Sequence, residues 1–195
     1  MCGRYFFDLD SEELRELYKK IQNQAREEER LAEKIATGEI YPTNHVVTLI
    51  SEENQITPTL TQWGFTGYKK GQLMINAKSE TVEEKKTFSK AFKQSRCVFP
   101  MSGFYEWDSS KQKHLFSNGK VTYVAGFYRT HHSESGNQME SIIMTTSPNT
   151  SVSKVHDRMP VIIEKEDIDR FITDLDFARE YIKGGMPALK SKLVS

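Results

Sequence analysis

The sequence has none of the features that would place it in a membrane or a secretory pathway. Its apolar runs fall well short of the ~20 residues that a membrane-spanning helix needs. The N-terminus, MCGRYFFDLD, lacks the basic stretch and the following apolar segment of a secretion signal. We therefore expect a soluble cytoplasmic protein that has no membrane partner.

Cysteine is also scarce, since only Cys2 and Cys97 occur among the 195 residues. A structural disulfide is unusual in the reducing cytoplasm. Neither the two cysteines nor the five histidines show spacings such as C-x-x-C or H-E-x-x-H, which are typical of metal sites. The sequence thus predicts no disulfide scaffold, no metal and no cofactor.

Net charge is absent as well, because 27 basic and 27 acidic residues cancel. A neutral chain has no overall field that gathers nucleic acid, so a polyanion would have to be held by a local basic patch. Hydrophobic residues make up 37% and charged residues 28%, as in globular proteins. No repeat or Pro/Gly-rich linker divides the chain, and its length suits one domain, which we place over residues 1–195.

The spacing of apolar residues predicts many strands and a few helices. Helical spacing marks four segments, 14–21, 81–94, 166–173 and 176–183. Strands are expected at 45–51, 57–65, 73–77, 97–107, 121–129, 141–146 and 159–164. Asn118-Gly119 lies between two strand-like runs, which predicts a type I′ hairpin. These elements together indicate an α+β domain.

The N-terminal Met1-Cys2-Gly3 offers a reactive group. A small residue at position 2 favours removal of Met1, which would leave Cys2 with a free α-amine. Unperturbed, that amine has a pKa of about 7.7–8.0 and the thiol one of about 8.5, so both are partly reactive near neutral pH. Gly3 permits close approach of a substrate to the backbone. We infer a covalent nucleophile at Cys2, against the ordinary alternative of a cysteine that only packs.

Two further motifs carry ionisable side chains. Glu106 lies within the apolar run Gly103–Trp107, where burial would raise its pKa toward the range useful for proton transfer. The ordinary alternative is a glutamate at a strand end that faces water. His156 precedes a predicted strand and could move protons, and Arg158 could bind a phosphate or carboxylate. Taken singly, a surface loop with a local ion pair explains these last two better.

A fourth motif is Asn76-Ala77-Lys78. Asn76 ends a predicted strand, where its amide could hold a backbone or substrate oxygen, and Lys78 points the same way in an extended chain. An Asx turn that leads into the next helix is the ordinary alternative.

Taken together, these motifs resemble the SRAP family of abasic-site processing proteins. The matching segments run along essentially the whole chain: MCGRY at 1–5, Trp63-Gly64, NAKSE at 76–80, RCVFPMSGFYEW at 96–107, VAGFY at 124–128, TTSPN at 145–149 and VHDRMPV at 155–161. A start of MCG is unspecific, whereas its combination with GFYEW and H-x-RMP is highly specific. The resemblance implies the SRAP fold, a monomer with a barrel-like sheet of antiparallel or mixed strands and peripheral helices.

The resemblance also implies binding of single-stranded DNA that contains an abasic site, as part of the DNA-damage response. The α-amine of Cys2 would form a Schiff base with the aldehyde of the ring-opened sugar, and the thiol would then close a thiazolidine ring. The resulting DNA–protein crosslink would protect the lesion. The family is linked as well to peptidase-like removal of its own N-terminal segment, which here is Met1 alone.

Residue roles follow from the same resemblance. The implied catalytic residues are Cys2, Asn76, Glu106 and His156, and the implied DNA contacts are Arg4, Trp63, Lys78, Thr145 and Arg158. The chain departs from the family at Lys78, where arginine is usual, and lysine lacks the two-pronged guanidinium. It departs again after Trp63-Gly64, where Phe65-Thr66-Gly67-Tyr68 replaces a Leu/Ile-Pro segment and a longer loop.

Two other functions stay open on the sequence alone. One is an N-terminal-nucleophile glutamine amidohydrolase, which also begins with Cys-Gly after Met and uses the thiol for acyl transfer. GFYEW and H-x-RMP have no evident place in such an enzyme. The other is a binding module in which Cys2 is incidental.

Overall fold

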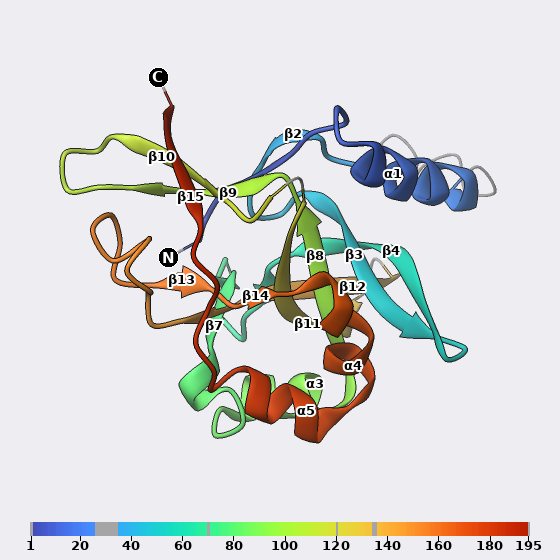
Figure 1. The fold of residues 1–195 in the computed structure, drawn as a ribbon. Coiled ribbons are helices and arrows are strands. Elements are labelled where there is room, and N and C mark those ends of the chain that lie inside the picture. Colours follow the sequence, from blue (N-terminus) through green and yellow to red (C-terminus); the bar gives the residue numbers. More distant parts are fainter. Residues whose placement is uncertain (1, 26–34, 70, 120, 134–135, 195) are drawn as a thin grey trace.

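The protein folds into two main sheets with helices around them (Figure 1). The computed structural model describes residues 2–25, 35–69, 71–119, 121–133 and 136–194. In these ranges no helix is both long and apolar enough to cross a membrane.

The larger sheet closes into a barrel. Its five strands are β3 (His45–Glu52), β4 (Gln55–Trp63), β8 (Arg96–Met101), β11 (Thr122–Ser133) and β12 (Gly136–Thr146). The order β4-β3-β8-β11-β12 returns to its start, because β12 pairs with both β11 and β4. The β12–β4 pairing is parallel and the others are antiparallel. The expected α+β fold with a mixed, barrel-like sheet is confirmed.

Short strands extend the barrel and correct two sequence predictions. The predicted strand at 73–77 is divided at Ile75 into β6 (Leu73–Met74), which pairs with β5 (Phe65–Thr66), and β7 (Asn76–Lys78), which runs parallel to β12. The predicted strand at 159–164 is likewise two pieces, β13 (Met159–Pro160) beside β12 and β14 (Ile162–Ile163) beside β11. The chain can change partners there because Val161 bonds to both Met144 and Ala125.

The second sheet is antiparallel and carries the N-terminus. Its order is β15 (Lys190–Val194), β10 (Lys113–Ser117), β9 (Gly103–Trp107), β1 (Tyr5–Phe7) and β2 (Gly38–Ile40). β1 thus lies between β9 and β2, with Tyr5 opposite Phe104 on one side and Ile40 on the other. This pairing fixes the path of the chain immediately after Cys2.

The expected single strand at 97–107 is wrong, because the chain passes from one sheet to the other at Ser102. Ser102 donates its N–H to the carbonyl of Phe6 at 2.8 Å, and its hydroxyl accepts from the N–H of Asp8 at 2.9 Å. Gly103 follows, and a Cβ there would lie 2.4 Å from the carbonyl oxygen of Phe116. The apolar run continues through this bend, so its composition does not reveal the change of sheet.

The predicted type I′ hairpin at Asn118-Gly119 is also wrong. β10 pairs with β9 and β15, and no pairing with β11 is found in the described ranges. Among the described residues of this turn, Gly119 alone has a positive φ, of 78°. A type I′ turn needs positive φ at both central residues. The structure has this geometry at Glu53 and Asn54, with φ of 49° and 62°, between β3 and β4. No glycine marks that turn in the sequence.

The helices lie on the outside of the sheets. They are α1 (Glu12–Ala25), η1 (Ser79–Thr81), α3 (Lys86–Gln94), η2 (Lys165–Asp167), α4 (Ile168–Thr173) and α5 (Leu175–Tyr181). In Figure 1, α1 lies at one side of the molecule, and α3, α4 and α5 lie together below the barrel. The helix expected from residue 81 begins at Lys86, because the N–H groups of Glu84 and Lys85 both bond to Thr81 in a turn.

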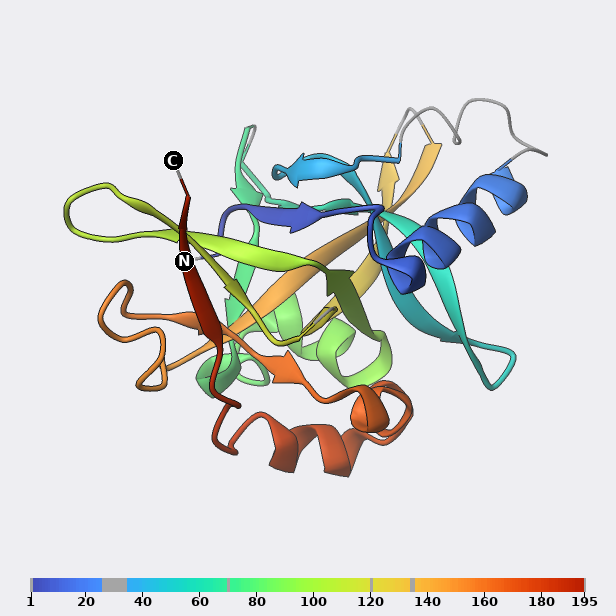
Figure 2. The same ribbon diagram turned by 45° about the horizontal axis from the view of Figure 1, so that its top comes forward.

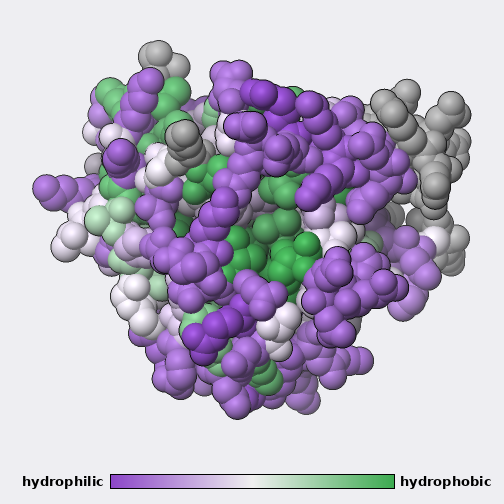
Figure 3. All heavy atoms as spheres, turned by 45° about the vertical axis from the view of Figure 1, so that its right-hand side comes forward, coloured by the Kyte–Doolittle hydropathy of each residue, from purple (hydrophilic) through white to green (hydrophobic). Residues whose placement is uncertain are grey.

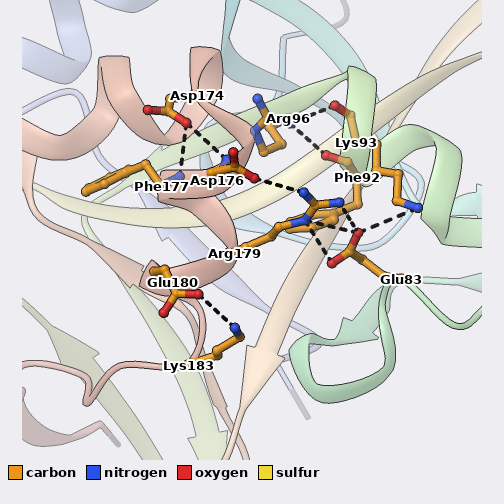
Figure 4. Close-up of polar contacts among 10 residues, drawn as sticks. All are labelled: Glu83, Phe92, Lys93, Arg96, Asp174, Asp176, Phe177, Arg179, Glu180 and Lys183. Atoms are coloured by element: carbon orange, nitrogen blue, oxygen red, sulfur yellow. Dashed lines mark hydrogen bonds and ion pairs between the residues drawn. The ribbon is translucent and has the colours of Figure 1, made fainter.

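Arg96 joins two of these helices to the barrel. Its buried guanidinium donates to four backbone carbonyls at 2.7–3.0 Å, those of Phe92, Lys93, Phe171 and Ile172. These carbonyls belong to the last turns of α3 and α4, where a helix leaves its C=O groups without partners. Burial lowers the pKa of Arg96. Figure 4 shows Arg96 with Phe92 and Lys93 of α3, beside Arg179, which links α5 to Glu83 at 2.8 Å.

Hydrophobic residues gather in two clusters inside the fold. One includes Cys2, Trp63 and Phe104 and lies between the barrel and the second sheet. The other includes Phe92 and Phe171 and lies between the barrel and the helices α3 and α4. The face in Figure 3 is mostly hydrophilic and surrounds a hydrophobic hollow near its centre. Cys2 is therefore part of the interior and not of a frayed terminus.

Candidate active site

Cys2 lies where the two sheets meet. Figure 2 shows β1, the strand that follows Cys2, between β2 and β9 of the second sheet. Cys2 is fully buried. Its carbonyl accepts a hydrogen bond of 3.0 Å from Nδ2 of Asn76 on β7. β7, which pairs with the barrel strand β12, thus holds Cys2, which lies shortly before β1. Met1 lies outside the described residues, so its removal stays a prediction.

The thiol of Cys2 is not poised as a thiolate in this arrangement. Burial raises its pKa far above the ordinary value, and the negative charge of Glu106 raises it further. Thiolates are the nucleophilic form of cysteine. The thiol would therefore need a nearby base before it attacks an electrophile.

Glu106 is the nearest candidate for that base. It lies on β9 opposite His114 of β10, and only 3% of its surface is exposed. Burial raises the pKa of its carboxyl group. The alternative of a glutamate that faces water is therefore wrong. A raised pKa makes the carboxylate a stronger base, so it holds a proton that it accepts more firmly than an exposed glutamate would.

His156 faces Glu106 from the loop before β13. Its Nε2 lies 3.7 Å from Oε2 of Glu106. On the other side of the ring, Nδ1 accepts from the N–H of Arg158 at 3.0 Å, and Oδ1 of Asp157 lies 2.9 Å away. The Arg158 N–H suits an Nδ1 without a proton, whereas the Asp157 carboxylate suits an Nδ1 that carries one, so these contacts do not fix which ring nitrogen is protonated.

Asn76 completes this group. While its Nδ2 holds Cys2, its Oδ1 is buried and has no hydrogen-bond partner among the described residues. An unpaired buried oxygen is unfavourable by roughly 1–3 kcal/mol. Cys2, Asn76, Glu106 and His156 are therefore brought together as predicted neighbours, with one acceptor left open for a ligand. Whether they carry out catalysis stays a prediction.

Arg158 lies beside them and is already paired. Its two Nη atoms bond to the carboxylate oxygens of Glu80 at 2.7 and 2.8 Å, and Nη2 also bonds to the carbonyl of Thr145 at 2.8 Å. Lys78 of β7 lies opposite Thr145 and is exposed. Thr145 itself is fully buried, so its hydroxyl is not available at the surface. Its carbonyl accepts from Arg158, and its contact with DNA stays a prediction.

Arg4 belongs to a second cationic cluster. Its guanidinium carbon lies 4.2 Å from the ring centre of Tyr41 and 5.1 Å from that of Trp107, and Nη1 lies 3.4 Å from Glu39. The ring of Tyr41 is 43% exposed. The sequence analysis did not predict either aromatic neighbour. Tyr41 comes from a loop distant in the chain, and Trp107 ends the GFYEW motif without a signal that ties it to Arg4. That Arg4, Lys78 and Arg158 contact DNA stays a prediction.

Trp63 supports the site from the interior. It has no exposed surface in this structure, and its contact with DNA stays a prediction. Its Nε1 donates to the carbonyl of Ile75 at 3.1 Å, and its ring centre lies 5.4 Å from that of Tyr5. Ile75 precedes Asn76, and Tyr5 lies in the strand that follows Cys2. Trp63 therefore positions the two strands that meet at the site.

No three His, Cys, Asp or Glu side chains in the described part of the chain are grouped so that they could hold a metal ion. The chemistry of the site has to be argued from the thiol, the carboxyl, the imidazole and the amide described above.

Known proteins resemble this chain, some in sequence and others in fold. The abasic site processing proteins YoqW and YobE of Bacillus subtilis are 28% and 25% identical over 199 and 195 aligned residues, and each alignment covers 94% of this chain and 87% of the relative. A solved protein from Bordetella bronchiseptica has the same fold, with a TM-score of 0.76 at 17% identity and full coverage of both chains. Residues 1–190 match the family described as SRAP, SOS response associated peptidase. The chain therefore belongs to the SRAP family.

Proposed function

We propose that this protein processes abasic sites in single-stranded DNA and that it does so by covalent attachment through Cys2. The names of its relatives support abasic-site processing. The observation that carries the covalent part is the hydrogen bond from Asn76 to the Cys2 carbonyl, beside Glu106 and His156. This hydrogen bond fixes the backbone of Cys2. Once Met1 is removed, Cys2 would carry both a free α-amine and a thiol.

The amine attacks first. While Met1 is present, the nitrogen of Cys2 is an amide and is not nucleophilic; after its removal, the amine adds to the aldehyde of the ring-opened sugar. Loss of one water molecule gives an imine, and the thiol then adds to the imine carbon to close the thiazolidine. One C–N and one C–S bond form. The second step is intramolecular, and well-oriented cases reach effective molarities of ~10⁵–10⁸ M.

Glu106 moves protons on the cysteine side. Before attack it accepts a proton from the amine, and during ring closure it takes the proton of the thiol, whose pKa burial has raised. Burial raises the pKa of Glu106, which makes its carboxylate a stronger base for this exchange than an exposed one would be.

His156 acts at the sugar oxygen. Nε2 is the ring nitrogen on the side of Glu106, so when it carries a proton it can donate to an oxygen in the space next to that carboxyl group. Asn76 keeps Cys2 in place, and its open Oδ1 would accept from a hydroxyl of the bound sugar. That contact would satisfy the buried oxygen only when the substrate is present.

Arg4, Lys78 and Arg158 would hold the flanking phosphates. Glu39 and Glu80 now occupy Arg4 and Arg158, and a phosphate can replace such a carboxylate because it offers the same paired oxygen acceptors. Binding would then depend on salt, because each neutralised phosphate releases counterions.

The test is to mix the purified protein with a single-stranded oligonucleotide that contains one abasic site and to run a denaturing gel. We expect a band of slowed mobility that requires the abasic site. No such band, combined with release of ammonia from glutamine, would instead indicate an amidohydrolase.

A further inference from the structure

A second groove lies between α3, the end of β11 and the loop after β5. It encloses about 420 Å³. We call it the α3 groove and define it by Tyr68, Lys86, Lys90, Gln94, Arg129 and His132. Lys86, Lys90 and Gln94 are spaced by four residues, so they line one face of the helix. None of these residues belongs to the site at Cys2.

The α3 groove is cationic, although the chain as a whole is neutral. None of the described residues that line it carries a carboxylate. Lys86 and Lys90 are exposed and form no ion pair within the described part of the chain, while Arg129 is held by Glu140 at 2.8 Å. The positive end of the α3 dipole also lies here, and the first turn of α3 has no acidic residue.

Other grooves of the molecule show the contrast. Five acidic residues line the groove beside α1: Asp8, Asp10, Glu12, Glu13 and Glu16. Three acidic residues line the groove between η1 and α5: Glu80, Glu83 and Glu84. The α3 groove differs from these two in the sign of its charge. A groove beside β10 and β15 is also lined by lysines, Lys111 and Lys113, but Lys113 is paired with Glu39.

An exposed aromatic ring stands at the same groove. The side chain of Tyr68 is 92% exposed, which is unusual for a tyrosine in a folded protein. Lysines that track a phosphate backbone beside an aromatic ring on which a base can stack are the two components of sites for single-stranded nucleic acid. An acidic peptide would use the lysines but would have no use for the ring.

The α3 groove is also close to the Cys2 site along one strand. Arg129 lies opposite Glu140 of β12, and Ile143 of the same strand lies beside Asn76. Three residues of a strand span only ~10 Å. Glu140 and Ile143 point to opposite faces of β12, because successive side chains alternate along a strand, so DNA that joins the two sites would have to cover more than these ~10 Å.

We propose that the α3 groove binds the single strand that runs on from the abasic nucleotide, with Lys86 and Lys90 at its phosphates and Tyr68 stacked on a base. This inference rests on the proposed function and extends it to a second contact. It predicts that the groove adds affinity for a long strand and has no part in the bond-forming steps.

The experiment compares two oligonucleotides with one central abasic site, a short one with ~3 nucleotides on either side and a long one with ~15, which exceeds the usual span of one such binding surface. The variant is Lys86→Glu with Lys90→Glu. The matched control is Lys19→Glu with Lys20→Glu, which makes the same charge change at two exposed lysines of α1. Affinity is measured with Cys2→Ala added, and crosslinking with Cys2 present.

We expect the α3 variant to bind the long strand at least ~10-fold more weakly than the control and to reduce the slope of log affinity against log salt by ~1.4, for two phosphates. Crosslinking of the short strand at saturation should proceed at the wild-type rate. Tyr68→Ala should weaken binding of the long strand by ~5-fold or more, and Tyr68→Phe should not.

Long-strand affinity of the α3 variant within about twofold of the control would overturn the inference. So would an equal loss for both lengths, because the groove would then be part of the first site. If the wild-type protein crosslinks neither oligonucleotide, the proposed function fails, whereas a preserved dependence on Lys86, Lys90 and Tyr68 would still support the groove as a nucleic-acid site.

Discussion

Nε2 of His156 lies 3.7 Å from Oε2 of Glu106, and the two residues reach this position from different sheets. Glu106 lies on β9 of the second sheet, whereas His156 precedes β13, which pairs with the barrel strand β12. The meeting of an acid and a base beside Cys2 is therefore a product of the tertiary fold. Each group can be tested separately, because each is assigned a different proton.

Glu106→Gln should slow crosslink formation by about 10²–10⁴-fold, the range that general acid–base catalysis contributes. The amide cannot take the proton of the amine or the thiol. DNA affinity should not change, because the side chain is buried and affinity comes from phosphate contacts. The measurement is the single-turnover rate at saturating DNA. Glu13→Gln, at a carboxylate held by Lys165, is the control that should keep the wild-type rate.

The same substitution should also show the raised pKa of Glu106, through the pH dependence of the free energy of unfolding. Because burial raises this pKa in the folded state, the folded protein keeps its proton to a higher pH than the unfolded chain does. The free energy of unfolding therefore falls as pH rises from about 4.3, the unfolded value, through the folded value. Glutamine has no such dependence, so the stability of Glu106→Gln relative to wild type should increase over this window. Denaturant unfolding at several pH values measures it, and a constant difference would contradict the raised pKa.

His156→Ala should slow both the formation and the reversal of the crosslink by the same factor. A group that donates a proton in one direction accepts it in the other, so the equilibrium yield should stay as it is. His114→Ala is the matched control, because His114 lies opposite Glu106 on β10 but bonds to Asp108 at 3.1 Å. If only formation slows, His156 has another role.

Lys78→Arg should leave binding of single strands unchanged or tighten it. Arginine restores a two-pronged donor at an exposed position beside Thr145. Lys78→Gln should instead weaken binding and lower the slope of log affinity against log salt by about 0.7, for one phosphate. A salt titration of both variants checks this. An unchanged slope in Lys78→Gln would remove Lys78 from the DNA contacts.

The sequence predicted the barrel strands and the neighbours of Cys2, because apolar alternation and specific motifs are local signals. It missed the break at Ser102, since the apolar run continues through it, and the turn at Glu53-Asn54, since no glycine marks it. It could not show that Trp63 is buried or that Arg96 bonds to four carbonyls. Burial and hydrogen-bond partners depend on residues far apart in the chain. A sequence motif contains residues that support the fold as well as residues that could contact a substrate, and it does not distinguish the two.

The intact mass of the protein after reaction with an abasic oligonucleotide tests the central claim most directly. We predict an adduct whose mass equals that of the protein without Met1 plus the oligonucleotide, less one water molecule. Cys97→Ala, at a buried thiol away from the N-terminus, should form the same adduct. Cys2→Ala should form no stable adduct, because it has no thiol to close the ring. An adduct that retains Met1, or one that Cys2→Ala forms as stably as the wild type, would contradict the thiazolidine mechanism.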